Sequence, residues 1–212
     1  MNKSIEITTL KVAESIIGGI AKTSKLDTHS TSLSAFDCKT GSKLALIKGS
    51  VCNKCYARKG MYAFKNVKEA LKKRTKLIKD KNWVEALTFI ISNKKKIVNS
   101  GLFRWHDSGD IQDAAHFKKI LKVAENTSTI KHWIPTKESN IVKKYKGSIP
   151  DNIVIRLSGS MVDGKAPNYR WTSTVTTDPD KATCRAFETG GECNGCTKCY
   201  DRDIENVVYL QH

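Results

Sequence analysis

The chain has 212 residues, of which 39% are hydrophobic and 8% aromatic, and its 37 Lys and Arg against 21 Asp and Glu give a formal net charge of +16. This length suits one domain, or one domain with a small appendage, and the apolar content excludes a disordered chain. No apolar run approaches the roughly 20 residues of a membrane span, and the charged N-terminal stretch is not typical of a signal peptide. We therefore expect a cytoplasmic protein with no membrane partner.

The regular part of the chain begins after a weakly periodic stretch, residues 1–50, in which turns are expected at Gly18-Gly19 and Gly41. Two predicted helices begin at Asn66 and Asn82, each followed three residues later by a Glu, as in a capping box. Apolar residues with helical spacing predict helices at 66–79, 82–100, 114–124 and 138–146. Short apolar runs predict strands at 102–106, 129–135, 152–159, 171–177 and 206–210.

Strands and helices alternate with long connections between the strands, which indicates βαβ units, an α/β class and a parallel sheet. Ligands of such folds bind at the carboxyl ends of the strands. In this chain those ends are His106–Asp110, Thr136–Glu138 and Ser158–Ser160. Residues 1–180 are expected to form this domain, and residues 181–212 a cysteine-rich segment without a second hydrophobic core.

The seven cysteines fall into two groups, one near each end of the chain. In a reducing cytoplasm, clustered cysteines indicate a metal rather than disulfides, and an odd number disfavours a fully paired framework. The two groups are Cys38, Cys52 and Cys55, and then Cys184, Cys193, Cys196 and Cys199.

The C-terminal group contains a Cys-x2-Cys-x2-Cys run, which is typical of a polynuclear iron–sulfur cluster. Structural zinc sites use more separated pairs, so zinc is the alternative metal, and unligated thiols are a third interpretation. The N-terminal group supplies three thiolates, which would leave one iron of a [4Fe–4S] cluster open. Alternatively, His29, His106 or His212 completes a zinc site, or Cys38 is an ordinary buried cysteine.

Polar residues crowd the end of the strand at 102–106. A small-residue turn ending in a carboxylate, Ser108-Gly109-Asp110, can receive a ligand ammonium group. The alternative is that Ser108 or Asp110 merely caps the following helix. Arg104 and Arg156 lie inside strands, and buried arginines normally meet a carboxylate or a ligand. Either arginine could therefore pair with Asp107 or Asp110.

The charge is uneven, because residues 1–100 hold 21 basic and 7 acidic residues while residues 101–212 hold 16 and 14. A basic half can mark a surface for nucleic acid or another polyanion. The alternative is that Lys simply covers solvated helix faces. Only 7 of the 37 basic residues are Arg, the residue preferred for bidentate phosphate contacts.

The cysteine loop and the strand that follows it resemble those of radical S-adenosylmethionine enzymes. Cys52-Asn-Lys-Cys55 and Ser108-Gly109-Asp110 stand where that family has its three-cysteine loop and its Gly-Gly-Glu-like turn. The usual loop is CxxxCxxC, whereas here 13 residues separate Cys38 from Cys52, the first cysteine of the pair. The resemblance implies a partial parallel (β/α) barrel, TIM-barrel-like, with a cysteine-rich C-terminal flap.

The same resemblance implies roles for the candidate residues. Cys38, Cys52 and Cys55 would hold a [4Fe–4S] cluster whose open iron takes S-adenosylmethionine. Ser108, Gly109 and Asp110 would meet its ammonium, while Lys137, Ser158 and Ser160 would reach its carboxylate or ribose. Cys184, Cys193, Cys196 and Cys199 would hold an auxiliary cluster, and catalysis would need an external electron donor.

A closer resemblance, over residues 30–212, is to the gene-product-88-type family of bacteriophages. It rests on the cysteine loop, two strand segments and the C-terminal cysteine run, namely Cys52–Tyr62, Phe103–Asp110, Trp133–Lys137, Cys193–Cys199 and the final Tyr209-x2-His212. The resemblance implies a phage origin and a location in the host cytoplasm.

Three functions are therefore expected as alternatives. The first is a phage iron–sulfur enzyme similar to radical S-adenosylmethionine enzymes. The second is a basic, metal-stabilised protein that binds nucleic acid or a host factor. The third is an iron–sulfur electron-transfer or scaffold protein without S-adenosylmethionine.

Overall fold

The computed structural model describes residues 6–23 and 25–211, and its centre is a mixed sheet of seven strands. The strands lie side by side in chain order, β1 antiparallel to β2 and all later neighbours parallel. They are β1 (Ala21–Lys22), β2 (His29–Ser30), β3 (Leu102–Arg104), β4 (Lys131–Thr136), β5 (Ile153–Val162), β6 (Thr172–Thr176) and β7 (Asn206–Leu210). The expected α/β class, the parallel sheet and all five predicted strands are confirmed. In the described chain β1 and β7 do not pair, so the sheet is open.

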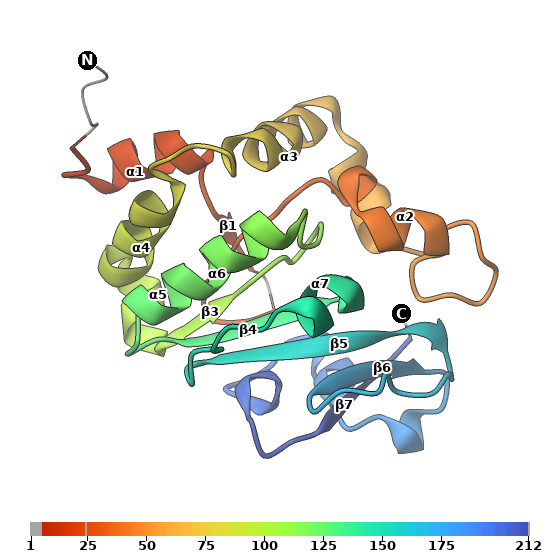
Figure 1. The fold of residues 1–212 in the computed structure, drawn as a ribbon. Coiled ribbons are helices and arrows are strands. Elements are labelled where there is room, and N and C mark those ends of the chain that lie inside the picture. The colour runs from red at the N-terminus through yellow and green to blue at the C-terminus, as the bar shows by residue number, and fades with distance from the viewer. Residues whose placement is uncertain (1–5, 24, 212) are drawn as a thin grey trace.

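The helices lie on one side of this sheet, and the C-terminal segment covers the other (Figure 1). The α-helices are α1 (Leu10–Ile17), α2 (Lys39–Leu44), α3 (Lys65–Leu77), α4 (Trp83–Asn93), α5 (Lys95–Ser100), α6 (Ala114–Asn126) and α7 (Ser139–Lys144). Short 3-10 turns are η1 (Ala35–Asp37), η2 (Tyr56–Arg58), η3 (Gly60–Ala63), η4 (Pro179–Lys181), η5 (Ala186–Thr189) and η6 (Lys198–Tyr200). No helix in the part of the chain that the structure describes could cross a membrane.

The alternation of side chains along the strands separates two apolar clusters. In β4, Ile134 belongs to the main core beneath the helices, while its neighbour Trp133 belongs to a smaller cluster on the opposite face. The main core buries residues of α1, α4 and α6 against β3, β4 and β5. The smaller cluster joins Trp133 to Leu26 and Tyr200. The second face is therefore covered by the cysteine-rich segment.

Several predicted helix boundaries were wrong. Gly41 lies inside α2 rather than in a turn, and the predicted helix at 82–100 is broken at Lys94 into α4 and α5. The capping box at Asn66 does not form, because α3 begins one residue earlier and its N-cap is Phe64. The oxygen of the Asn66 side chain instead accepts from the amide of Val67.

The strand β5 continues past the predicted end at Gly159, so Ser158–Ser160 lie within the strand. Backbone bonds from the cysteine loop explain the extension. Val51 N donates to Ser160 O at 2.9 Å, and Val162 N donates to Gly49 O at 3.0 Å. The loop that carries Cys52 is thereby fixed to the carboxyl end of β5.

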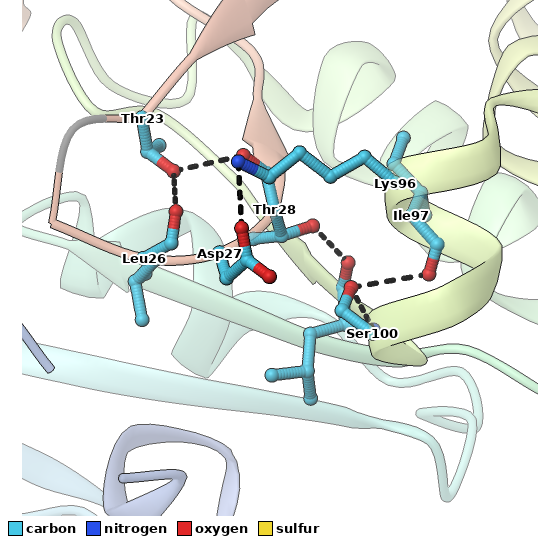
Figure 2. A network of polar contacts seen from close by, with 8 residues as sticks. Thr23, Leu26, Asp27, Thr28, Lys96, Ile97 and Ser100 are labelled. Atoms are coloured by element: carbon cyan, nitrogen blue, oxygen red, sulfur yellow. Dashed lines mark hydrogen bonds and ion pairs between the residues drawn. The ribbon is translucent and has the colours of Figure 1, made fainter. Parts of the chain in front are cut away.

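The short hairpin of β1 and β2 is fixed to α5 and β3 by polar contacts (Figure 2). The Thr23 hydroxyl donates to the carbonyls of Leu26 and Thr28 at 2.7 and 2.9 Å, and the Thr28 hydroxyl donates to the carbonyl of Leu102. Lys96 of α5 pairs with Asp27 at 2.7 Å. These contacts hold the first parallel neighbour, β2, against β3.

Two buried histidines make the fold sensitive to acid. Burial lowers the pKa of His116 and of His132 to about 3. In the unfolded chain each would titrate near 6.5, so below that pH the unfolded state binds more protons than the folded one. The free energy of unfolding should therefore fall as pH falls from about 6.5 toward about 3, by on the order of 1 kcal/mol per pH unit for each histidine.

Urea unfolding at pH 7, 6 and 5 measures this slope. The double variant His116→Gln/His132→Gln should be less stable at pH 7 and should lose less stability per pH unit than the parent. An unchanged slope would show that these imidazoles do not control the acid response.

Candidate functional site

Cys38, Cys52 and Cys55, the first cysteine group, are brought together by the long connection between β2 and β3. Cys38 is the N-cap of α2 and Cys55 the N-cap of η2, while Cys52 follows the segment that pairs with β5. Gly41 faces the first two. A Cβ on Gly41 would lie 3.6 Å from the Cys52 Sγ, 3.8 Å from the Cys38 Sγ and 3.1 Å from the Cys38 Cβ. The absence of a side chain at Gly41 thus lets both cysteine side chains pack closely against the backbone of α2.

The electrostatics of the first group join it to the carboxyl ends of β3 and β4. Burial raises the pKa of the Cys38 thiol, and the negative charges of Asp110, Cys55 and Cys52 raise it further. Burial also raises the pKa of Cys52, against the opposing charge of Lys137. Three thiols, one carboxylate and one ammonium group therefore share one neighbourhood.

The Asp110 carboxylate accepts three internal hydrogen bonds. Its Oδ1 accepts from the Thr136 hydroxyl at 2.6 Å and from the Ile111 amide at 2.7 Å, and its Oδ2 accepts from the Lys137 amide at 2.9 Å. Burial raises its pKa to about 6, although these bonds favour the charged form. The carboxylate thus connects the end of β3 to the end of β4.

Ser108 and Gly109 also make internal contacts. The Ser108 hydroxyl donates to the Leu33 carbonyl at 2.8 Å, and Gly109 has φ 80° against Leu33, whose Cβ would lie 2.5 Å from an added Cβ. The helix-capping alternative was wrong for Ser108 and Asp110, because the cap of α6 is Asp113, which accepts from the His116 amide. The buried turn packs on the residues after β2.

The other three predicted ligand residues, Lys137, Ser158 and Ser160, line a single cavity of about 250 Å³ at the carboxyl ends of β4 and β5. The Lys137 Nζ donates to the Gly159 carbonyl at 2.5 Å. Burial lowers the pKa of Lys137, and the charges of Cys52 and Asp110 partly restore it. Lys137 therefore stands between this cavity and the first cysteine group.

Cys184, Cys193, Cys196 and Cys199, the second cysteine group, lie in the connection between β6 and β7. The charges of Cys184 and Cys193 both act on Cys199, and those of Cys184 and Cys196 act on Cys193. Between Cys193 and Cys196, Asn194 and Gly195 have φ 43° and 78°. Two successive left-handed residues turn the chain tightly, which brings those two cysteines together.

Burial raises the pKa of Cys199 to about 11, against a hydrogen bond with Tyr209 that lowers it. The Cys199 Sγ lies 3.1 Å from the Tyr209 hydroxyl, which comes from β7. The spacing of the cysteines did not reveal this tyrosine. The motif Tyr209-x2-His212 was its only signal in the sequence.

Arg156 fastens the second group to the sheet. It is fully buried in β5, and its guanidinium donates to carbonyls of the C-terminal segment, among them Cys199 at 3.0 Å, Asp201 at 2.7 Å and Ile204 at 2.8 Å. The predicted pairing with Asp107 or Asp110 was wrong for this arginine. Because main-chain oxygens surround it, the cation fixes the path of the backbone that carries the cysteines.

Arg104 lies between the two groups. Its guanidinium carbon is 4.9 Å from the centre of the Trp133 ring, and its pKa is raised by the charges of Tyr56, Asp107, Tyr209 and Tyr200 against the cost of burial. Tyr56 adjoins Cys55 in the chain, and Tyr209 contacts Cys199. The Arg104 guanidinium therefore interacts with a tyrosine beside each cysteine group.

The structure forms no disulfide among the seven cysteines, all of which belong to the described residues. Within residues 6–23 and 25–211, no three side chains of His, Cys, Asp or Glu are placed to hold a metal ion directly. Of the histidines considered for a zinc site, His29 and His106 show no charge interaction with the first group. His212 lies outside the described residues.

The fold and the site together define a class: an α/β protein with two groups of cysteines, one of which lies near a cavity at the carboxyl ends of the strands. A family profile described as gene product 88 matches residues 19–202. The chain belongs to this family, which is of phage type. Neither a curated protein nor a solved structure matches the chain significantly.

Replacing Arg156 tests how the second group is held. Arg156→Met removes the donors from several buried carbonyls, so the free energy of unfolding should fall by about 3 kcal/mol or more. Limited proteolysis should then cut first within 184–204. Urea titration measures the loss, and Arg170→Met, at an exposed arginine beside Trp171, is the matched control with little expected change. Equal stability of the two variants would contradict the anchoring role.

Proposed function

We propose that the protein is an iron–sulfur protein that carries a [4Fe–4S] cluster on the first cysteine group and a second cluster on the second group. The observation that carries the proposal is the close approach of the Cys38 and Cys52 side chains to Gly41, with Lys137, which lines the cavity, near Cys52. Seven reduced thiols in two groups supply the soft ligands that such clusters require.

The donor set suits a cluster with one position free at the first group. The group supplies three thiols, and the three internal hydrogen bonds that the nearby Asp110 carboxylate accepts disfavour it as a fourth ligand. When bound, a [4Fe–4S] cluster supplies one-electron chemistry and an iron that can take a ligand. Loading would have to draw the thiols closer together than they lie here.

The chain's own residues would hold and orient that ligand. Lys137, Ser158 and Ser160 present one ammonium group and two hydroxyls to the cavity, which suits a small molecule with a carboxylate and hydroxyls. The half-buried Lys137 also opposes the negative charge of Cys52. S-adenosylmethionine has this chemistry, and a radical-type enzyme acting in the host cytoplasm with an external electron donor is the proposed form of the activity.

Anaerobic purification with iron and sulfide tests the cluster proposal. The parent should be brown, with absorbance near 400 nm and roughly eight irons per chain, and zinc should be absent. Cys52→Ala and Cys199→Ala should each lose about half of the iron. A colourless protein with stoichiometric zinc would overturn the proposal.

Gly41→Ala is the sharper variant, because it adds one methyl group between the thiols and removes no ligand. Alanine in a helix interior is favoured over glycine by about 1 kcal/mol, so the chain should stay folded while its iron falls toward four per chain. Lys43→Ala, at an exposed position of the same helix, should keep the parent's iron content. Full iron in Gly41→Ala would show that the close approach of the thiols to Gly41 is not needed for the cluster.

Ligand binding is tested separately on the reduced, iron-loaded protein. S-adenosylmethionine should change its electron paramagnetic resonance signal. Lys137→Met should remove that change and leave the iron content intact. If S-adenosylmethionine leaves the signal of the parent unchanged, this ligand is excluded although the clusters are present. The function would then be the third alternative, an iron–sulfur electron-transfer or scaffold protein.

A further inference from the structure

The connection that carries the first cysteine group also forms a strongly cationic surface. Residues 36–76 hold twelve Lys and Arg against Asp37 and Glu69, a net charge of +10. Ten of the twelve are lysines, and all ten are exposed. Along this stretch η1 contacts α2 and η2, η2 contacts η3, and η3 contacts α3. These charges therefore belong to one region, along the upper right of Figure 1. We call this region, residues 36–76, the cationic surface.

The helix α3 is the clearest part of the cationic surface. It spans 13 residues, of which Leu71 alone is buried. Lys65, Lys68, Lys72 and Lys76 recur at spacings of three and four and therefore share one face. Like charges at such spacings destabilise a helix by roughly 0.2–0.5 kcal/mol per pair. A polyanion laid along this face would remove the repulsion, whereas a purely solvated helix gains nothing from it.

Exposed rings stand among these charges. Phe64, at the start of α3, is 60% exposed, and Phe36 and Tyr56 are also exposed. The Phe36 ring lies beneath two cations, Arg58 at 5.2 Å and Lys68 at 5.4 Å. The Tyr56 hydroxyl donates to the Asp107 carbonyl, which fixes the ring while its face remains open. Fixed rings among lysines are what single-stranded nucleic acids bind, by base stacking and phosphate contacts.

We propose that the cationic surface binds single-stranded nucleic acid, with the phosphates along the Lys face of α3 and bases stacked on Phe64, Phe36 and Tyr56. The proposal does not depend on iron. Lysines suit this task, because they act as point charges on the backbone and give binding without sequence preference. Met161 lines the Lys137 cavity and touches the Gly49 position, so a bound strand would pass close to that cavity.

One other occupant, an anionic membrane surface, is an outcome of the test. Leu46, Ile47 and Met61 are exposed in the same region and could enter an anionic membrane surface. They do not form one apolar face of a helix, since Leu46 and Ile47 follow α2 and Met61 lies in η3. α3 carries its charges without an exposed apolar stripe of large residues. Charge and stacking therefore favour nucleic acid over lipid.

Fluorescence anisotropy with a labelled 15-nucleotide oligo-dT measures the binding at several salt concentrations. The affinity should fall steeply as the salt concentration rises. For each phosphate contact, the logarithm of the binding constant should fall by about 0.7 per tenfold rise in salt. Lys68→Gln/Lys72→Gln/Lys76→Gln should weaken binding at least tenfold and lower the slope by about 2. Lys118→Gln/Lys143→Gln/Lys144→Gln, at exposed lysines of α6 and α7, keeps the same net charge as the first variant and should bind like the parent.

The rings are tested at fixed salt. Phe64→Ala should weaken binding about fivefold or more without changing the salt slope, because base stacking is not a charge effect. If both lysine variants lose the same affinity, binding is a net-charge effect and the assignment to this surface is overturned. No oligonucleotide binding, or binding of vesicles with anionic lipid in its place, would overturn the proposal. The oligonucleotide affinity is measured on both iron-free and iron-loaded protein, so an effect of the clusters on binding is distinguished from an effect of the cationic surface.

Discussion

Arg156 is the constraint on which the second face of the protein depends. A buried guanidinium normally finds a carboxylate, yet this one is surrounded by main-chain oxygens of the segment that follows β6. Such a cation determines the position of a backbone rather than of a side chain. The segment 184–204 has few apolar residues with which to pack, so its path over β4 and β5 is set by polar contacts. The second cysteine group is placed by that path.

The two cysteine groups occupy equivalent positions in the topology. One lies in the connection from β2 to β3 and the other in the connection from β6 to β7, so one precedes and one follows the central parallel strands. Arg104 of β3 acts on Tyr56 near the first group and on Tyr209 and Cys193 near the second. The positive charge of Arg104 lowers the pKa of Cys193, so it favours the thiolate of that cysteine. The same guanidinium lies over the ring of Trp133.

The sequence predicted the strands well, because each is a short apolar run between turn residues and five such runs repeat with long connections. It predicted the grouping of the cysteines, since C-x2-C spacings bring thiols together in any compact turn. It missed α1, which spans only eight residues of a stretch with weak periodicity, and α2, whose only large apolar residue is Leu44 and which contains Gly41, a glycine that indicated a turn. It did not predict the hydrogen bonds that Asp110 accepts from the Thr136 hydroxyl and the Lys137 amide. Those partners lie 26 and 27 residues away and leave no local signal.

Under the two proposals, the positive charge of the protein has two separate roles. Thiolates at the first group need positive charge close by, and the half-buried Lys137 and Arg58 supply it. The exposed lysines of α3 serve poorly for that purpose, because solvent and salt screen exposed charges beyond about 8–10 Å. Ten exposed lysines exceed what a few buried thiols require, and their repulsion costs stability in every state of the protein that lacks a polyanion. Four of these lysines share one face of α3, and this alignment suits the proposed polyanion, a ligand larger than the cavity beside Lys137.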